Sequence, residues 1–229
     1  ENQSIIKTIQ ERFQSLDCVY IADGHHRSES AAKVIRRKKN ETEKEPIPDS
    51  YHYFLQVLFP DDEVNILPYN RIAEKPKELS LQEIMSKAES DFIVSKNNEG
   101  NHSPETPHSF GIYTEGYWYQ MELVNGRIKE DDPVAEIDAE VLQQYFIEPI
   151  LKIEDPKTDK RIQFVGGIRG NKELESRVDS GEFDIAFSLY PTSVSQLLSV
   201  ADAQKVMPPK STWFEPKLRS GMVVHLLTD

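Results

Sequence analysis

The sequence predicts an α+β fold: a mixed sheet with flanking helices. Before residue 125, two pairs of strand-like runs are separated by short turns, a pattern typical of β-hairpins. In the final third of the chain, strand-like and helix-like patterns alternate. The 229 residues are 38 % hydrophobic and 29 % charged, a balance typical of a globular chain rather than a disordered one.

The length allows one large domain or two small ones. The pattern changes near residues 76–80 and again near residues 125–135, so either position could be a boundary. We place the boundary at the first of them, which divides the chain into portions 1–78 and 79–229.

The first portion is predicted to contain two helices around a short strand. Residues 2–15 form a helix because large apolar residues recur in them at helical spacing. Residues 18–22 are an apolar run with the length and β-branching of a buried strand, which an Asp-Gly pair ends. Residues 25–39 return to helical spacing and finish with four cations, which the negative end of a helix dipole favours.

The middle of the chain is predicted to contain a hairpin and a capped helix. Residues 51–59 and 64–67 are the two strand-like runs of the hairpin. A helix follows over residues 80–90, with Ser80 as its N-cap and Glu83 completing a capping box.

The second portion is predicted to continue with a hairpin formed by residues 110–113 and 118–123. A helix over residues 139–146 then ends before Pro149, since proline breaks helix interiors. The remaining expected elements are, in order, a strand at 161–165, a helix at 172–178, a strand at 183–189, a helix at 193–201 and a strand at 222–227.

The charge of the chain excludes several classes of partner. The net charge is −12, from 39 acidic and 27 basic residues. An acidic chain is repelled by phosphate backbones, so we expect no nucleic-acid partner, although a local basic group can still hold a small anion. No apolar run approaches the roughly 20 residues that cross a bilayer, so no membrane-spanning segment is expected.

Cys18 is the single cysteine, so neither an intramolecular disulfide nor a Cys/His zinc pattern can form. Because it lies in the predicted strand, we expect an inert core thiol. The absence of disulfides is typical of a reducing compartment, which predicts a cytoplasmic protein. The first residues carry neither an initiator methionine nor a signal-peptide pattern, so we expect a piece of a longer protein.

The sharpest candidate site is the turn at residues 23–27, called here the 23–27 turn. A phosphate site needs unpaired backbone amides, close approach and positive charge. The start of the predicted helix supplies the amides, Gly24 the close approach, and Arg27 with His25 and His26 the charge. Asp23 could cap the helix, hold a metal or act as a base. The alternative is an ordinary helix start with solvated side chains, and we predict no metal pair, because adjacent histidines on a helix point in different directions.

A second candidate is the proline-rich loop that begins at Lys210 and Ser211. Two hydroxyls and three cations within ten residues could clamp an anion there, and loops on a rigid scaffold often carry function. The alternative is a surface loop pinned by the rings of Trp213 and Phe214. Three glycines within residues 166–170 also permit close backbone approach, but a tight strand–helix turn is the favoured interpretation of that motif.

At the 23–27 turn the sequence resembles the bacterial family catalogued as domain of unknown function 1015. The run Ile21-Ala22-Asp23-Gly24-His25-His26-Arg27 carries the resemblance. It continues in Leu67-Pro68-Tyr69-Asn70-Arg71, in Phe164-Val165-Gly166-Gly167-Ile168-Arg169-Gly170 and in Met207-Pro208-Pro209-Lys210-Ser211-Thr212-Trp213. The likeness spans nearly the whole chain, and only residues 75–135 have little to match.

The resemblance implies a fold and a ligand. The family is grouped with ParB and sulfiredoxin-like folds, in which a Gly-x-x-Arg turn at a helix start contacts nucleotide phosphate. It implies a ParB/sulfiredoxin-like strand–turn–helix in portion 1–78 and a further α/β portion after it. Gly24, His25, His26 and Arg27 would contact the phosphate of a nucleotide that is bound with Mg²⁺. Because family members are longer at the N-terminus, the chain is expected to be the C-terminal portion.

The sequence therefore predicts a nucleotide- or phosphate-ligand-binding domain, either a small-molecule phosphotransferase or a nucleotide hydrolase. Asp23 and His26 are the candidate catalytic residues. The candidate ligand contacts are Gly24, His25, His26, Arg27, Lys210 and Ser211, and no protein metal site is predicted. The alternative is a non-catalytic regulatory or protein-interaction module with the same fold, and nucleic-acid binding ranks third.

Overall fold

The computed structural model describes residues 2–41, 49–97, 102–128, 131–219 and 221–227. Contacts divide the chain into unit 1, which is Glu1–Phe59 with Lys217–Asp229, and unit 2, which is Pro60–Pro216. The predicted α+β class with flanking helices is confirmed, but the expected mixed sheet is wrong, since every strand pair among the described residues is antiparallel. The chain passes between these units at residues 59–60 and 216–217. The domain boundary at residue 78 stays a prediction.

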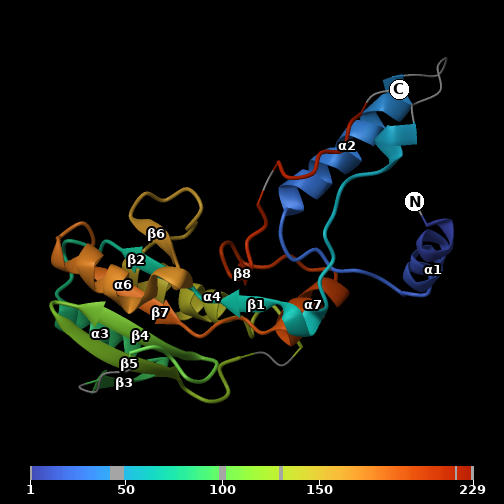
Figure 1. Cartoon of the computed structure of the whole chain (residues 1–229). Coiled ribbons are helices and arrows are strands. Elements are labelled where there is room, and N and C mark those ends of the chain that lie inside the picture. Colours follow the sequence, from blue (N-terminus) through green and yellow to red (C-terminus); the bar gives the residue numbers. More distant parts are fainter. Residues whose placement is uncertain (1, 42–48, 98–101, 129–130, 220, 228–229) are drawn as a thin grey trace. The chain divides into compact units, whose positions relative to one another are not determined.

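Unit 2 contains a six-stranded antiparallel sheet in the order β3-β5-β4-β7-β2-β6 (Figure 1). Its strands are β2 (Tyr69–Ala73), β3 (Phe92–Asn97), β4 (Ser109–Thr114), β5 (Tyr117–Leu123), β6 (Ile162–Gly166) and β7 (Ile185–Leu189). The predicted β4–β5 hairpin is confirmed. β2 is antiparallel to both β6 and β7, so these two strands are parallel to each other and are joined by helix α6 (Gly170–Asp179).

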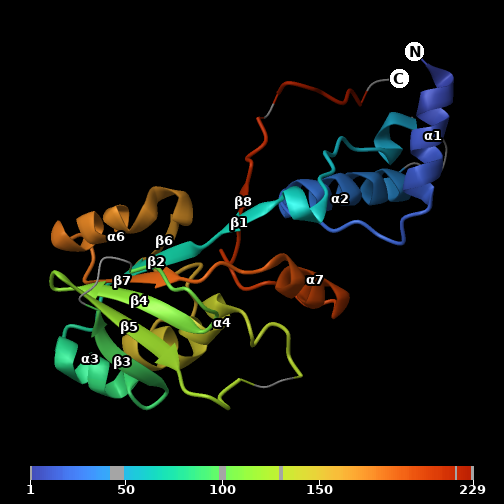
Figure 2. The same ribbon diagram turned by 60° about the horizontal axis from the view of Figure 1, so that its bottom comes forward.

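Helices cover both faces of this sheet (Figure 2). α6 packs on one face, where Leu174 and Val178 meet Ile72 and Trp118 in one apolar cluster. The opposite face is covered by α3 (Leu81–Ala88), α4 (Asp138–Leu142) and α5 (Glu148–Leu151). The larger cluster lies there and also includes Val200 of α7 (Val194–Asp202). Unit 2 therefore has its own two-sided hydrophobic core.

The capping signals in this unit are confirmed. Ser80 and Glu83 form the predicted capping box at the start of α3.

The helix predicted over residues 139–146 runs further: after α4 it becomes a π-helical turn, Gln143–Ile147, and continues into α5. The expected stop before Pro149 is wrong because this proline occupies the first turn of α5, where its missing N–H costs little.

The hairpin predicted from residues 51–59 and 64–67 is wrong. β1 (Asn65–Leu67) pairs instead with β8 (Trp213–Glu215), antiparallel and with Ile66 opposite Phe214. Both of these side chains are buried, and this burial favours the long-range pairing. Residues 53–59 form no strand and are exposed. Strands β2, β3 and β8 were not predicted, because polar or proline-rich residues interrupt their patterns.

Unit 1 contains α1 (Gln3–Gln14), which the Asn2 side chain caps, and α2 (His25–Glu41). Both helices were predicted. The strands predicted at residues 18–22 and 222–227 are wrong: neither run is a β-strand, and both are exposed except for half-buried Ala22. Cys18 is exposed rather than a core thiol. Short 3₁₀ turns lie at Asp49–His52 and, in unit 2, at Asp61–Glu63 and Gly167–Arg169.

Candidate functional site

The 23–27 turn, in unit 1, has the backbone of an anion-binding helix start. Gly24 adopts a left-handed conformation with φ of +82°, which residues with a side chain rarely adopt. α2 begins directly after it, and the Ser28 N–H donates to the Gly24 carbonyl at 3.0 Å. The N–H groups of residues 25–27 precede this first intrahelical bond, so they have no acceptor within the helix.

Arg27 brings positive charge to the turn. Its guanidinium lies beside Gly24: a Cβ at position 24 would be 3.3 Å from Nη2 and 3.4 Å from Nε of Arg27. Gly24 therefore provides both the left-handed turn and the space for this side chain. A planar group of N–H donors next to first-turn amides is suited to binding a phosphate.

A second cation reaches the turn from the C-terminal part of unit 1. Lys217 Nζ donates to Asp23 Oδ2 at 2.9 Å, and the Gly24 N–H donates to Oδ1 at 2.7 Å. Both carboxylate oxygens of Asp23 therefore have a donor. The sequence alone could not link Lys217 to Asp23, because no spacing rule joins partners that are 194 residues apart.

These contacts fix the charge of Asp23. Partial burial raises the pKa of the Asp23 carboxyl, but the Lys217 hydrogen bond, the Gly24 N–H and the charges of Lys217 and Arg27 together lower it below its ordinary value. Asp23 is therefore a carboxylate at neutral pH. His25 and His26 are exposed on the first turn of α2. The catalytic roles expected of Asp23 and His26 stay predictions.

The other predicted contacts, Lys210 and Ser211, lie together in unit 2. Lys210 has a left-handed backbone with φ of 54°, and its exposed ammonium lies 5.3 Å from the Tyr69 ring centre. Ser211 is buried, and its hydroxyl donates to the Pro208 carbonyl at 2.7 Å. The hydroxyl of Ser211 thus stabilises its own loop, while the Lys210 ammonium faces solvent.

Two of the glycines within residues 166–170, Gly166 and Gly167, allow close packing. A Cβ on Gly166 would lie 2.4 Å from two atoms of the Trp213 ring, and one on Gly167 would lie 2.6 Å from the Pro68 carbonyl oxygen. The Gly167 N–H donates to that carbonyl at 2.8 Å. The favoured interpretation, a tight strand–helix turn, is confirmed.

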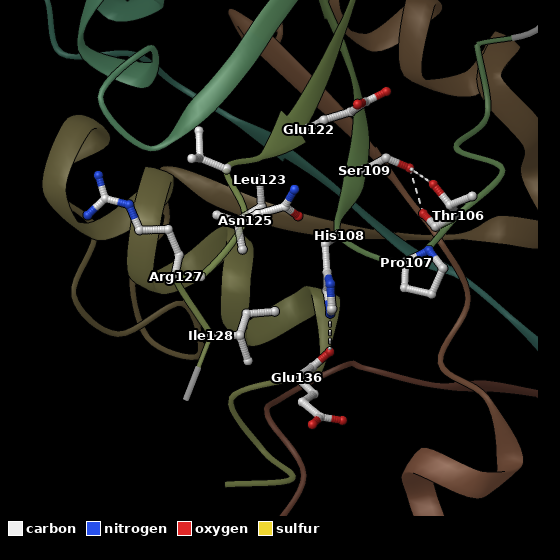
Figure 3. A pocket seen from close by; sticks show the side chains of 12 residues that line it. Thr106, Pro107, His108, Ser109, Glu122, Leu123, Asn125, Arg127, Ile128 and Glu136 are labelled. Carbon is white, nitrogen blue, oxygen red and sulfur yellow. Dashed lines mark hydrogen bonds between the residues drawn. The ribbon is translucent and has the colours of Figure 1, made fainter. Parts of the chain in front are cut away.

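A cavity of about 420 Å³ lies in unit 2 beside the end of β5 (Figure 3). His108 extends along it, and its Nε2 lies 3.0 Å from the Glu136 carbonyl oxygen. Figure 3 shows the carboxylates of Glu122 and Glu136 turned away from the His108 ring. No sequence pattern predicts this cavity, since its walls come from three separate segments of the chain.

Asp138 contacts His108, which lines this cavity. The His108 N–H donates to both of its carboxylate oxygens, at 3.0 and 3.2 Å. Burial raises the pKa of Asp138 to about 7, although hydrogen bonds from the backbone of His108 and Tyr190 oppose the shift. His108 itself has a left-handed backbone, with φ of 63°, so this carboxyl holds a strained residue in place.

Two further findings concern only the described residues. No group of three or more His, Cys, Asp or Glu side chains among them is arranged to hold a metal ion. Likewise, none of their helices combines the length and the apolar character that crossing a membrane requires.

Comparison with known proteins gives one family. The family model described as "Protein of unknown function (DUF1015)" matches residues 1–140. No curated protein matches the chain.

Several solved structures are similar. A free serine kinase in complex with AMP is 14 % identical with a TM-score of 0.45, and the alignment covers 93 % of this chain and 78 % of that chain. A variant of that kinase in complex with ADP is 16 % identical with a TM-score of 0.43, covering 87 % and 69 %. A conserved hypothetical protein from Pyrococcus furiosus is 15 % identical with a TM-score of 0.42, covering 87 % and 71 %. Likeness at this level identifies neither a ligand nor a reaction for this chain.

Proposed function

The chain belongs to the family of unknown function DUF1015, and we propose that it is a nucleotide- or phosphate-ligand-binding domain whose anion site is the 23–27 turn. One observation carries the proposal: left-handed Gly24 begins α2 with the Arg27 guanidinium against it. The family description assigns no activity, so the proposal rests on the residues of the turn.

In this proposal each residue of the turn has a role. The backbone N–H groups of residues 25–27 and the Arg27 guanidinium hold the phosphate group. His25 and His26, exposed beside them, stabilise transferred charge. Lys210 and Ser211 stay candidate contacts to the same class of ligand.

The reaction that suits the turn is phosphoryl transfer from a nucleotide to a small molecule. A hydroxyl oxygen of the acceptor attacks the terminal phosphorus, and the bond from phosphorus to the leaving oxygen of the nucleotide breaks. The hydroxyl proton of the acceptor passes to the Asp23 carboxylate. A ring N–H of His26 donates a hydrogen bond to the negatively charged leaving oxygen. Phosphoryl transfer depends mainly on positioning and charge neutralisation, which a small cationic turn can provide.

Mg²⁺, which the resemblance implies together with a nucleotide, does not fit at Asp23 as the turn stands. One oxygen of this carboxylate accepts from the Lys217 ammonium, whose positive charge repels a second cation but not a neutral hydroxyl, and the other accepts from the Gly24 N–H. Magnesium keeps several waters and is often bound mainly through substrate phosphates. We therefore assign no residue of the turn to the metal and derive no step through it.

We also propose that the chain is the C-terminal portion of a longer protein whose other part completes unit 1. The support is the exposure of unit 1: none of its described residues is buried. The ParB/sulfiredoxin-like assignment, the bacterial source and the cytoplasmic location stay predictions of the resemblance and the composition.

A thermal-shift screen tests the proposed function. ADP, ATP, CTP, GTP and pyrophosphate are added with and without Mg²⁺ to the wild-type chain, to Arg27→Ala and to Arg36→Ala. Arg36 is exposed on the same helix, so its variant controls for the loss of one charge. A ligand at about one hundred times its dissociation constant adds about 2.7 kcal/mol to the free energy of unfolding.

We expect stabilisation of the wild type and of Arg36→Ala, and none of Arg27→Ala. An equal shift in Arg27→Ala, or no shift with any ligand in the wild type, contradicts the proposal.

The second candidate function is a non-catalytic regulatory or protein-interaction module. The exposed apolar side chains of unit 1 favour it, since large exposed apolar patches mark interaction sites. Turnover separates the two functions. An enzyme consumes nucleotide when a small-molecule acceptor is present, whereas a module binds nucleotide without consuming it.

A further inference from the structure

Unit 2 contains a buried arginine, Arg71, that pairs with no carboxylate of the described residues. Arg71, on β2, is 3 % exposed. Its Nη1 donates to the Tyr69 carbonyl, its Nη2 donates to the Pro209 carbonyl at 3.2 Å, and the guanidinium lies 4.9 Å from the Phe164 ring centre. Within the described part of the chain, no acidic side chain pairs with it. Two of its five N–H donors are therefore satisfied, and its positive charge is not neutralised.

The carbonyl that Arg71 holds belongs to the residue before Lys210. The Lys210 ammonium lies 5.3 Å from the Tyr69 ring centre, and no acid among the described residues pairs with it either. The Tyr69 hydroxyl makes no hydrogen bond to another described residue. Tyr69, Arg71 and Lys210 thus form one group of donors, called here the Tyr69 corner, which contains two cations.

Glu215 lies near the aromatic rings of Tyr69 and Trp213, but its carboxylate already accepts a hydrogen bond from the Trp213 indole. The Tyr69 ring packs edge-on against Trp213 at 5.4 Å, and the Trp213 Nε1 donates to a Glu215 carboxylate oxygen at 2.7 Å. This contact orients Glu215 toward the indole.

A buried charge without a counter-ion opposes folding. Removing a guanidinium from water is costly unless an opposite charge compensates, and burial lowers the pKa of Arg71 to about 9. Arginine retained in such a position is suited to anion recognition, because its fork of N–H donors matches carboxylate and phosphate oxygens. An anion would supply the missing charge.

We propose that the Tyr69 corner binds a phosphate group. The exposed Lys210 ammonium and the Tyr69 hydroxyl contact it directly. Arg71 is a positioning residue: it holds the Pro209 carbonyl, fixes the left-handed backbone of Lys210, and adds its charge to the site. The inference rests on the proposed function for the class of ligand only, and the residues of this corner are separate from those of the 23–27 turn.

Calorimetric titration of the whole chain with inorganic pyrophosphate tests this inference. The variants are Lys210→Ala and Tyr69→Phe, with Lys172→Ala as the matched control because Lys172 is exposed on α6, on the other face of the sheet. We expect Lys210→Ala to weaken binding by about tenfold or more, the range of a hydrogen bond to a charged group. Tyr69→Phe should weaken it less, and Lys172→Ala should leave it unchanged.

The electrostatic role of Arg71 is tested with a measurement that a purely structural role would leave unchanged. We compare Arg71→Lys with Arg71→Met and measure how the association constant falls with NaCl concentration. If the charge of Arg71 acts on the ligand, Arg71→Met shows a shallower salt dependence than wild type and Arg71→Lys retains it. Should Arg71→Met fail to fold, Arg71→Lys and Lys210→Ala still decide the question.

The outcomes separate this inference from the proposed function. Weaker binding in Lys210→Ala with normal binding in Arg27→Ala supports the Tyr69 corner and contradicts the 23–27 turn. Weaker binding in both supports both sites. Unchanged affinity in both Lys210→Ala and Tyr69→Phe overturns the inference, whatever Arg27→Ala does, and absence of binding to the wild type overturns both.

Discussion

Phe187 and Phe54 illustrate how the two units differ. In unit 2, Phe187 has no exposed surface and its ring centre lies 5.1 Å from that of Phe146. In unit 1, Phe54 is 49 % exposed, and no described residue of that unit is buried. Unit 1 nevertheless forms α1, α2 and the 23–27 turn. Helices and turns depend on residues close in sequence, whereas a core requires distant segments to meet, so a region without a core can still present a local binding turn.

The largest effect expected from this difference is on stability. Phe187→Ala should lower the free energy of unfolding by about 3–5 kcal/mol, because it leaves a cavity in a packed core. Phe54→Ala should lower it by less than about 0.5 kcal/mol, as is usual for exposed positions. Urea unfolding of the two variants, followed by circular dichroism, measures both values. A large loss in Phe54→Ala would mean that unit 1 buries this ring after all.

The pH dependence of stability tests the polar interior of unit 2. The folded-state pKa of Asp138 is about 7 and its ordinary value is 3.8, so between these values the folded state binds more protons than the unfolded state. Stability contributed by Asp138 is therefore complete below about pH 4 and is lost as pH rises through 7. At 1.36 kcal/mol for each pKa unit, a shift from 3.8 to about 7 corresponds to a loss on the order of 4 kcal/mol.

Asp138→Asn removes this titration while keeping a carbonyl acceptor for the His108 N–H. We expect the difference in unfolding free energy, wild type minus variant, to decrease as the pH rises from 4.5 to 8. A difference that does not change with pH would mean that Asp138 has an ordinary pKa in the folded chain.

The contrast between local and long-range contacts also explains which elements could be predicted from the sequence. The β4–β5 hairpin and the Ser80 cap of α3 were predicted because adjacent residues determine them. β8 was missed, since its partner β1 lies almost 150 residues away and only their contact at Ile66 and Phe214 makes it a strand. The run at 18–22 was predicted as a strand from its β-branched residues, but a strand also needs a paired neighbouring strand, and residues 18–22 form no ladder with the described residues.

The residues of the two candidate sites also differ in whether the sequence alone could identify them. Gly24 and Arg27 could be identified from the sequence because four consecutive residues carry the motif. The Lys217–Asp23 ion pair and the burial of Arg71 could not, as they depend on contacts between residues that are far apart in the chain. A buried arginine has no sequence signal of its own, since most arginines are exposed.

The same substitution in each unit should act for different reasons. Gly166→Ala places a Cβ against the Trp213 ring at 2.4 Å and should cost about 1–3 kcal/mol by overpacking. Gly24→Ala meets only the Arg27 side chain, and its cost of about 1 kcal/mol comes from the left-handed backbone. Thermal unfolding measures both. Only Gly24→Ala should also weaken phosphate binding at the 23–27 turn, and equal affinity in that variant would remove Gly24 from the site.

The smallest effect concerns the exposed ion pair of unit 1. Lys217→Ala should lower the free energy of unfolding by less than about 1 kcal/mol, because both partners are largely solvated. The Asp23 pKa is depressed, so the stability from this pair is present above pH 3.8 and is lost as pH falls through the folded-state value. An NMR titration should show the pKa of Asp23 rising toward its ordinary value in the variant. No rise would mean that Lys217 does not contact Asp23 in solution.

The most direct test of the phosphate site at the 23–27 turn is calorimetric titration of the nucleotide that gives the largest thermal shift. It is performed on the wild-type chain, on Arg27→Ala and on Arg36→Ala under one salt concentration. The turn predicts that Arg27→Ala binds at least tenfold more weakly, a difference of about 1.4 kcal/mol, while Arg36→Ala binds like the wild type. Equal affinity in all three chains would contradict the assignment of the phosphate site to Gly24 and Arg27.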